Sequence, residues 1–105
     1  MPKENKEDLE NFLWDVSDEK KFYCINGSVF KNLEELEKAL RDMDEDTFNY
    51  HVNEYKNDFA TWIYDVIGDI KLSKNLMSVD KRKAIARKIK TRITYIKKNI
   101  NNSSI

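Results

Sequence analysis

Apolar residues recur along this chain mainly with the three- and four-residue spacing of α-helices. The first such stripe consists of Leu9, Phe12, Leu13 and Val16, at positions i, i+3, i+4 and i+7. A second stripe follows Asn32, whose side chain can accept a hydrogen bond from the first helical turn while Glu35 reaches back, as in a capping box. That stripe consists of Leu33, Leu36, Leu40 and Met43. Two short amphipathic helices are therefore predicted before residue 44.

The period changes between these two helices. Phe22-Tyr23-Cys24-Ile25 and Ser28-Val29-Phe30 are β-prone runs that flank Asn26-Gly27. Asn-Gly suits a type I′ turn, because both central residues of that turn have positive φ. The pattern predicts one short β-hairpin near residues 21–31. Two strands alone are marginal in water, so the hairpin must pack against helices.

The stretch from residue 45 to 67 allows one helix or two. Asp44-Glu45-Asp46 offers an N-cap and an acidic first turn. The apolar positions that follow suit one helix of about six turns. They are Phe48, Val52, Tyr55, Phe59, Trp62 and Val66. Against that, Asn57-Asp58 is a good N-cap pair just before Phe59. The pattern favours a break there, with Asp58 capping a helix in which Phe59 and Trp62 are buried.

The last third of the chain predicts a short helix and a long one. Gly68 suits a C-cap, and Asp69 can begin a short helix carrying Leu72 and Leu76. Ser78 is expected to cap the last helix, whose buried face carries Ile85, Ile89, Ile93, Ile96 and Ile100. Basic residues point the opposite way, with Lys97 near the edge of their face. They are Lys83, Arg87, Lys90 and Lys98. Residues 101–105 are expected to fray.

Together these elements predict a mostly α fold with a minor β part, of about five helices and one hairpin. Two glycines and one proline are too few for a turn-rich all-β protein, and 40% hydrophobic residues exclude a disordered chain. Residues 1–105 fit a single domain with an ordered core over about residues 7–100.

The zero net charge hides a strong asymmetry between the two parts of the chain. Residues 1–70 carry 8 Lys/Arg and 18 Asp/Glu, a balance of −10, whereas residues 71–105 carry 11 Lys/Arg and only Asp80, a balance of +10. Such asymmetry is a hint about partners. The basic helix can bind an acidic protein or a polyanion, or it can pair with the acidic part of its own chain.

Nothing in the sequence assembles into a known catalytic mechanism. Gly27 and Gly68 stand alone, so no phosphate loop is present, and one Cys and one His are too few for a zinc site. We therefore expect no enzyme activity, cofactor or metal. His51 is expected to be a partly buried, hydrogen-bonded residue, with Asp58 or a backbone carbonyl as partner. The single cysteine, Cys24, and the absence of a secretory signal or membrane-spanning run favour a cytoplasmic protein.

A set of motifs over residues 20–76 resembles a family of small prokaryotic domains of unknown function, found mainly in archaea. The motif carrying the resemblance is His-Val, followed by Asn-Asp-Phe-x-x-Trp-Ile-x-x-Val-x-x-Asp. Its residues include His51, Asn57, Asp58, Phe59, Trp62 and Asp69. The resemblance implies an accessory or interaction module rather than a defined activity.

Two functions therefore compete. The leading hypothesis is a non-enzymatic module that binds a protein partner or a second copy of itself. The alternative is binding of nucleic acid or another polyanion through the last helix, where Lys and Arg can neutralise phosphates. The candidate contacts in both cases are Lys83, Arg87, Lys90, Lys97 and Lys98.

Overall fold

A computed structural model of the chain describes residues 4–102 and shows a mostly helical fold with two small hairpins. The elements, in chain order, are α1 (Lys6–Phe12), the 3-10 helix η1 (Asp18–Lys20), β1 (Phe22–Tyr23), β2 (Val29–Phe30), α2 (Leu33–Asp42), α3 (Glu45–His51), β3 (Val52–Asn53), β4 (Lys56–Asn57), α4 (Asp58–Trp62), the π-helix η2 (Ile63–Ile67), α5 (Ile70–Met77) and α6 (Arg82–Asn102). The predicted fold class is confirmed.

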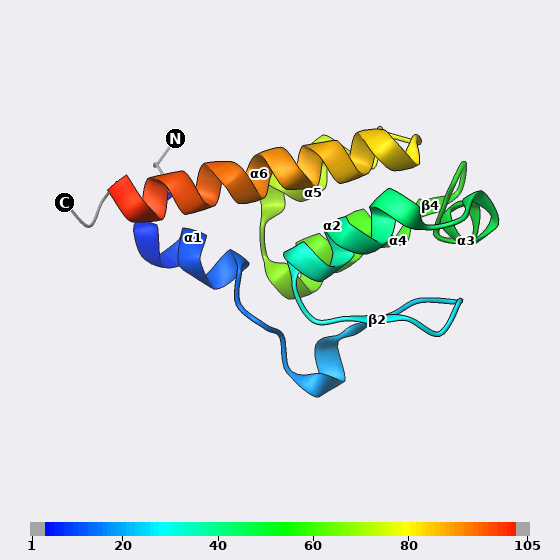
Figure 1. Cartoon of the computed structure of the whole chain (residues 1–105), viewed down its shortest axis with the longest axis horizontal. Helices are drawn as coiled ribbons and strands as arrows, with labels where there is room; N and C mark the ends of the chain where they lie inside the picture. Colours follow the sequence, from blue (N-terminus) through cyan, green and yellow to red (C-terminus); the bar gives the residue numbers. More distant parts are fainter. Residues whose placement is uncertain (1–3, 103–105) are drawn as a thin grey trace.

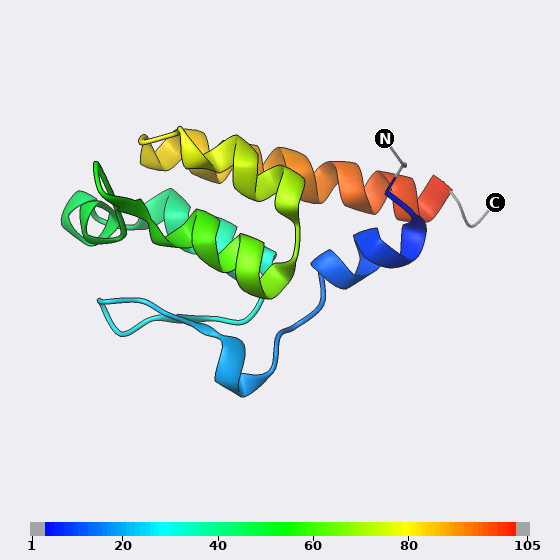
Figure 2. The same ribbon diagram turned by 180° about the vertical axis from the view of Figure 1, so that it is seen from behind.

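The helices form two layers, with the first hairpin beneath them. Helix α6 runs along one side of the molecule with α5 beside it, α2 and α4 lie under them, and β1–β2 lies on the far side of α2 and α4 (Figure 1). Seen from behind, α5 covers part of α6, and α4 continues through η2 in front of α2 (Figure 2). Helix α1 packs against α6 near its C-terminal end.

The core lies where these layers meet and uses the predicted apolar stripes. Leu33, Leu36 and Leu40 of α2 are fully buried, as are Ile85 and Ile89 of α6. Burial of such side chains contributes roughly 1.5–3 kcal/mol each, so the α2–α6 seam is a principal source of stability. Because α6 buries its isoleucines here, its opposite face is left to solvent.

The first hairpin is at the predicted place but has a different turn. Only glycines have positive φ among residues 4–102, so Asn26 does not adopt the type I′ conformation. Instead Gly27 N–H donates to the Cys24 carbonyl over 3.0 Å, and Gly27 has φ of 93°. This arrangement is a turn followed by a left-handed glycine, the usual form of a longer hairpin loop.

The prediction of a single hairpin is wrong. Val52 pairs with Asn57 and Asn53 with Lys56, which forms a second hairpin between α3 and α4. The break near Asn57 is confirmed, but the chain reverses through strands instead of passing directly from one helix to the next. Tyr55, predicted on the buried stripe, lies at the tip of this hairpin and is 87% exposed.

The ends of the later helices also differ in part from expectation. Gly68 ends η2 with φ of 88°, and Asp69 caps α5 through Leu72 N–H, both as predicted. Ser78, however, ends α5 instead of capping α6, which begins at Arg82. Helix α6 continues through Asn102, so the expected fraying does not include residues 101–102, and residues 103–105 lie outside the described part of the chain.

Candidate functional site

The motif histidine joins two parts of the fold. His51 ends α3 and is buried, with its Nε2 3.1 Å from the backbone N–H of Ile25 and its Nδ1 3.0 Å from Asp58 Oδ2. An N–H of Ile25 can only donate, so Nε2 must be the unprotonated nitrogen and Nδ1 carries the proton to Asp58. Both ring nitrogens are thereby occupied. His51 holds the turn of the first hairpin against α3 and α4.

Asp58 has a different role from the predicted one. The N-cap of α4 is Asn57, whose Oδ1 accepts from Ala60 N–H over 3.0 Å, while Asp58 is the first residue of the helix. Its carboxylate instead accepts from His51 and from Lys56 Nζ at 2.8 Å. Partial burial opposes ionisation, but these two hydrogen bonds outweigh it and lower the pKa of Asp58.

Asn57 uses both ends of its buried amide. While Oδ1 caps α4, Nδ2 donates to the Leu76 carbonyl over 3.0 Å at the end of α5. Asn serves better than Asp here because the position needs an acceptor and a donor at once. The residue therefore caps one helix and fixes the end of another.

The two aromatic residues of the motif belong to the core. Phe59 is fully buried and Trp62 is 7% exposed, with its indole N–H donating to the Lys20 carbonyl over 2.8 Å. Only the edges of His51, Asp58 and Trp62 reach a shallow hollow on the surface, beside Asp65. A buried tryptophan requires such a partner for its N–H, so its polar atom is already occupied.

Asp69, the last motif residue, forms a buried ion pair with Arg92, which was not among the predicted site residues. Its fully buried carboxylate accepts from Arg92 Nε at 2.7 Å and from Arg92 Nη2 at 2.9 Å, and Glu4 also accepts from Nη2. Burial favours the neutral form of Arg92, yet the hydrogen bonds to Asp69 and Glu4 outweigh it and raise its pKa. A guanidinium suits this place because it donates two parallel hydrogen bonds to one carboxylate.

A sequence signal for Arg92 does exist. It stands three residues after Ile89 and four before Ile96, which places it on the buried isoleucine face of α6. A charged residue at such a position is almost never fully buried unless it is paired. The sequence thus implied a carboxylate partner without identifying which one.

Some basic residues of α6 are paired with acidic side chains of the chain, and the others are not. Those turned towards the acidic part of the chain that precedes residue 71 are paired: Arg82 with Glu45 at 2.7 Å, Arg92 with Asp69, and Lys97 with Glu34. Arg82 also donates to the Leu40 and Arg41 carbonyls at the end of α2. Lys97, a predicted contact residue, therefore already has an acidic partner within the chain.

The other predicted contacts form an exposed surface that we call the cationic ridge. It consists of Lys83, Arg87, Lys90 and Lys98. All four are exposed, and none has an ion-pair partner among residues 4–102. At 1.5 Å rise per residue, the ridge extends over about 22 Å. The structure thus places the whole predicted strip at the surface, and Lys97 differs from the other four only in being paired with Glu34.

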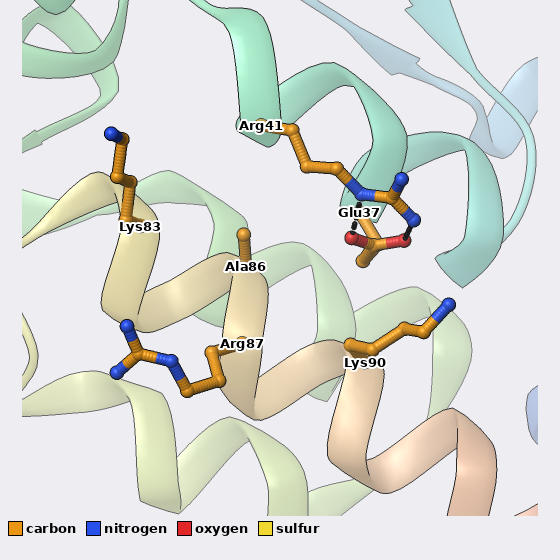
Figure 3. Close-up of a pocket in the computed structure, with 6 residues that line it drawn as sticks. All are labelled: Glu37, Arg41, Lys83, Ala86, Arg87 and Lys90. Atoms are coloured by element: carbon orange, nitrogen blue, oxygen red, sulfur yellow. Dashed lines mark hydrogen bonds and ion pairs between the residues drawn. The ribbon is translucent and has the colours of Figure 1, made fainter.

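A groove borders the ridge on its α2 side. Ala86 lies at its base, Lys83 and Lys90 flank it, and Glu37 and Arg41 form the α2 wall (Figure 3). Its volume is about 420 Å³. Glu37, the one acid in the lining, forms a two-point pair with Arg41, and the hydrogen bonds from Arg41 lower the pKa of Glu37. The remaining lining charge is that of Lys83, Arg87 and Lys90, so the groove favours anionic groups.

Within residues 4–102 no group of three His, Cys, Asp or Glu side chains could hold a metal ion. Cys24 is buried. Helices long and apolar enough to cross a membrane do not occur between residues 4 and 102.

Comparison with known proteins identifies a family but no characterised relative. Neither the curated proteins nor the solved structures include a match to this chain. A family model described as a family of unknown function, DUF5752, matches residues 12–104. Helix α1 lies almost entirely before the matched region, which includes both hairpins, the motif residues and α6. The chain therefore belongs to the DUF5752 family.

Proposed function

We propose that this protein is a non-enzymatic interaction module of the cytoplasm that binds an acidic protein through the cationic ridge. The observation that carries the proposal is the division of charge on α6. Side chains facing the body have carboxylate partners, whereas Lys83, Arg87, Lys90 and Lys98 have none within residues 4–102. A row of unpaired cationic side chains along a rigid helix produces a local positive potential, which attracts and orients an acidic partner.

The neighbouring groove adds shape to this charge. Ala86 is small, so a partner's side chain can approach the seam between α2 and α6 closely, with Lys83 and Lys90 at its sides (Figure 3). Arg41, on the α2 wall of the groove, is held in place by its two hydrogen bonds to Glu37 (Figure 3). A carboxylate entering there meets several donors at once, which gives stronger and more directional contacts than an isolated lysine.

A test of the proposal uses labelled polyglutamate as the acidic probe and the full chain. The substitution set Arg87→Gln, Lys90→Gln and Lys98→Gln removes three ridge charges. We expect it to weaken binding about tenfold or more and to flatten its dependence on ionic strength. The matched control, Lys20→Gln, Lys38→Gln and Lys74→Gln, removes three exposed charges elsewhere and should leave polyglutamate binding nearly unchanged.

A second copy of the chain is tested as a partner as well, because the acidic residues 1–70 of one copy carry charge opposite to that of the ridge of another. Sedimentation at low and physiological ionic strength detects self-association. Equal loss of binding in the ridge set and the control set would contradict a localised interface. Unfolding of the ridge set would show that these cations stabilise the fold, against the expectation for exposed charges.

One observation favours the alternative, binding of nucleic acid or another polyanion. Lys71 of α5 is exposed and lines the groove between α5 and α6, so the cationic surface is wider than the ridge itself. A random-sequence duplex and a single strand serve as probes. Tight binding to either, with a steep loss on adding salt and no binding to polyglutamate, would reverse the order of the two functions.

A further inference from the structure

A second groove lies on the other side of α6, between α6 and α5. Its lining comprises Lys71, Leu72 and Asn75 of α5 with Ala84, Arg87, Lys88, Thr91, Arg92 and Tyr95 of α6. The cavity has a volume of about 460 Å³. On α6 the lining extends from residue 84 to residue 95, or about 16 Å along the helix. These dimensions fall in the range of small-molecule sites.

Arg92 gives this groove a fixed donor. Nε and Nη2 are held by Asp69 and Glu4, which fixes the plane of the guanidinium. Its carbon also lies 5.8 Å from the ring centre of Phe12 and 5.5 Å from that of Tyr95. Arg92 Nη1 makes no hydrogen bond. Every buried side-chain nitrogen in residues 4–102 has a hydrogen-bond partner, so Nη1 is not buried and reaches solvent. Because Arg92 lines the groove, its guanidinium offers a pre-oriented donor there at little entropic cost.

The charge of the lining favours an anion even after the buried carboxylates are considered. Arg92 with Asp69 and Glu4 carries one net negative charge. Lys71, Arg87 and Lys88 outweigh it, and the lining contains no acidic residue. All three are exposed and have no ion-pair partner in residues 4–102. The local balance is thus positive, with two flexible ammonium groups beside one rigid guanidinium edge.

The rest of the lining is suited to an uncharged, flat group. Tyr95 is 46% exposed and borders the groove, so part of its ring is free for stacking. Leu72 and Ala84 supply apolar surface, and Asn75 and Thr91 supply hydrogen-bonding groups. A site with an exposed aromatic ring next to cations can hold both ends of a molecule that combines a ring with an anion.

The geometry points to a binding site for a small organic phosphate with a planar ring, of the nucleoside monophosphate class, in the α5–α6 groove. The phosphate meets Lys71, Lys88 and Arg92 Nη1, and the ring lies against Tyr95. A phosphate suits this arrangement because its several oxygens accept from all three donors together. The site is separate from the cationic ridge, apart from Arg87, and it can exist whether or not the ridge binds a protein.

The test is a titration of the isotope-labelled full chain with adenosine 5′-monophosphate, adenosine and inorganic phosphate, followed by NMR. We expect the monophosphate to shift amide signals of residues 71–75 and 84–95, and both fragments to bind more weakly. Lys88→Gln should weaken the monophosphate about tenfold, as loss of a charge-assisted hydrogen bond does. Tyr95→Leu should weaken the monophosphate but not inorganic phosphate. Lys83→Gln, on the ridge, should change neither.

Three results would overturn the inference. One is the absence of any shift with the monophosphate. Another is equal weakening by Lys83→Gln and Lys88→Gln, which indicates diffuse anion attraction. The third is equal affinity for inorganic phosphate and the monophosphate, which removes the role of the ring. If a random duplex shifts the signals of both the groove and the ridge while the monophosphate shifts none, the surface is a polyanion interface and the small-molecule site is wrong.

Discussion

Replacing Asn57 by alanine tests the most unexpected connection in the fold. The substitution removes the α4 cap, which is worth about 1 kcal/mol. It also removes the hydrogen bond from Asn57 Nδ2 to the Leu76 carbonyl. That carbonyl still accepts from Val79 N–H over 3.0 Å, so the loss is that of one net hydrogen bond, about 0.5–1.5 kcal/mol. We therefore expect the free energy of unfolding to fall by about 1.5–2.5 kcal/mol. Domains of this size have about 5–15 kcal/mol in total, so the variant should remain folded but much weakened.

Urea denaturation followed by circular dichroism measures the change, and two further variants divide it. Asn57→Asp keeps the acceptor for Ala60 N–H but replaces the donor to Leu76 by a carboxylate oxygen that repels the carbonyl, so it tests the second contact and should cost more than the hydrogen bond alone. Asp58→Ala removes the acceptor for His51 but leaves the cap intact, and should be less damaging than Asn57→Ala. If Asp58→Ala proves as destabilising as Asn57→Ala or more so, Asp58 is the essential residue of this pair and the assignment of roles is refuted.

Three further predictions concern stability. Trp62→Ala should lower the free energy of unfolding by about 3–5 kcal/mol in urea, because a buried aromatic residue is lost; an almost unchanged midpoint would place Trp62 at a functional surface instead. Arg92→Met strands the fully buried Asp69 carboxylate and should cost about 3–5 kcal/mol, whereas Glu4→Gln should cost far less. The hydrogen bond from Thr47 N–H lowers the pKa of Asp44 in the folded state, so its stabilising contribution is complete above the unfolded pKa of about 3.9 and is lost as pH falls towards the folded value. Asp44→Asn keeps a cap acceptor that does not titrate. On acidification its melting temperature should therefore fall less than that of the natural chain.

The helical part of the fold could be predicted from the sequence because its signals are local. Asn32, Asp44 and Asp69 are N-caps at the predicted positions, and each accepts a backbone hydrogen bond three residues ahead. The isoleucine face of α6 is likewise readable from spacing alone. These features depend on a few consecutive residues, so one sequence suffices to identify them.

The second hairpin could not be predicted in the same way. The turn between Val52-Asn53 and Lys56-Asn57 lacks the glycine that usually marks a tight hairpin turn. The apolar spacing also continues through this segment as it would in a helix. Within the reversal, Asn53 Oδ1 accepts from Tyr55 N–H over 3.0 Å and Asn53 Nδ2 donates to the Asn49 carbonyl over 3.1 Å. The hydrogen bond from Asn57 to Leu76, nineteen residues away, then fixes the end of the second strand. Propensity yields to tertiary contacts in such a segment.

The candidate site was only half visible in the sequence for a related reason. Spacing placed Lys83, Arg87, Lys90 and Lys98 on one exposed face. It could not show that Lys97 pairs with Glu34, or that Lys71 of α5 lines a groove beside α6. Ion pairs and grooves join residues from separate elements, and their geometry exists only once the helices are packed.

The buried ion pair between Asp69 and Arg92 constrains how the sequence of this protein can evolve. Loss of either partner alone leaves a charge without a counter-ion in the core, whereas replacing both by apolar side chains of similar volume is far less harmful. Asp69 also caps α5, so the residues that can replace it are limited further to those with a side-chain acceptor. Across the DUF5752 family these two positions are therefore expected to covary, being retained together or exchanged together. Glu4 lies outside the region that the family model matches, so its position is expected to drift independently of that pair.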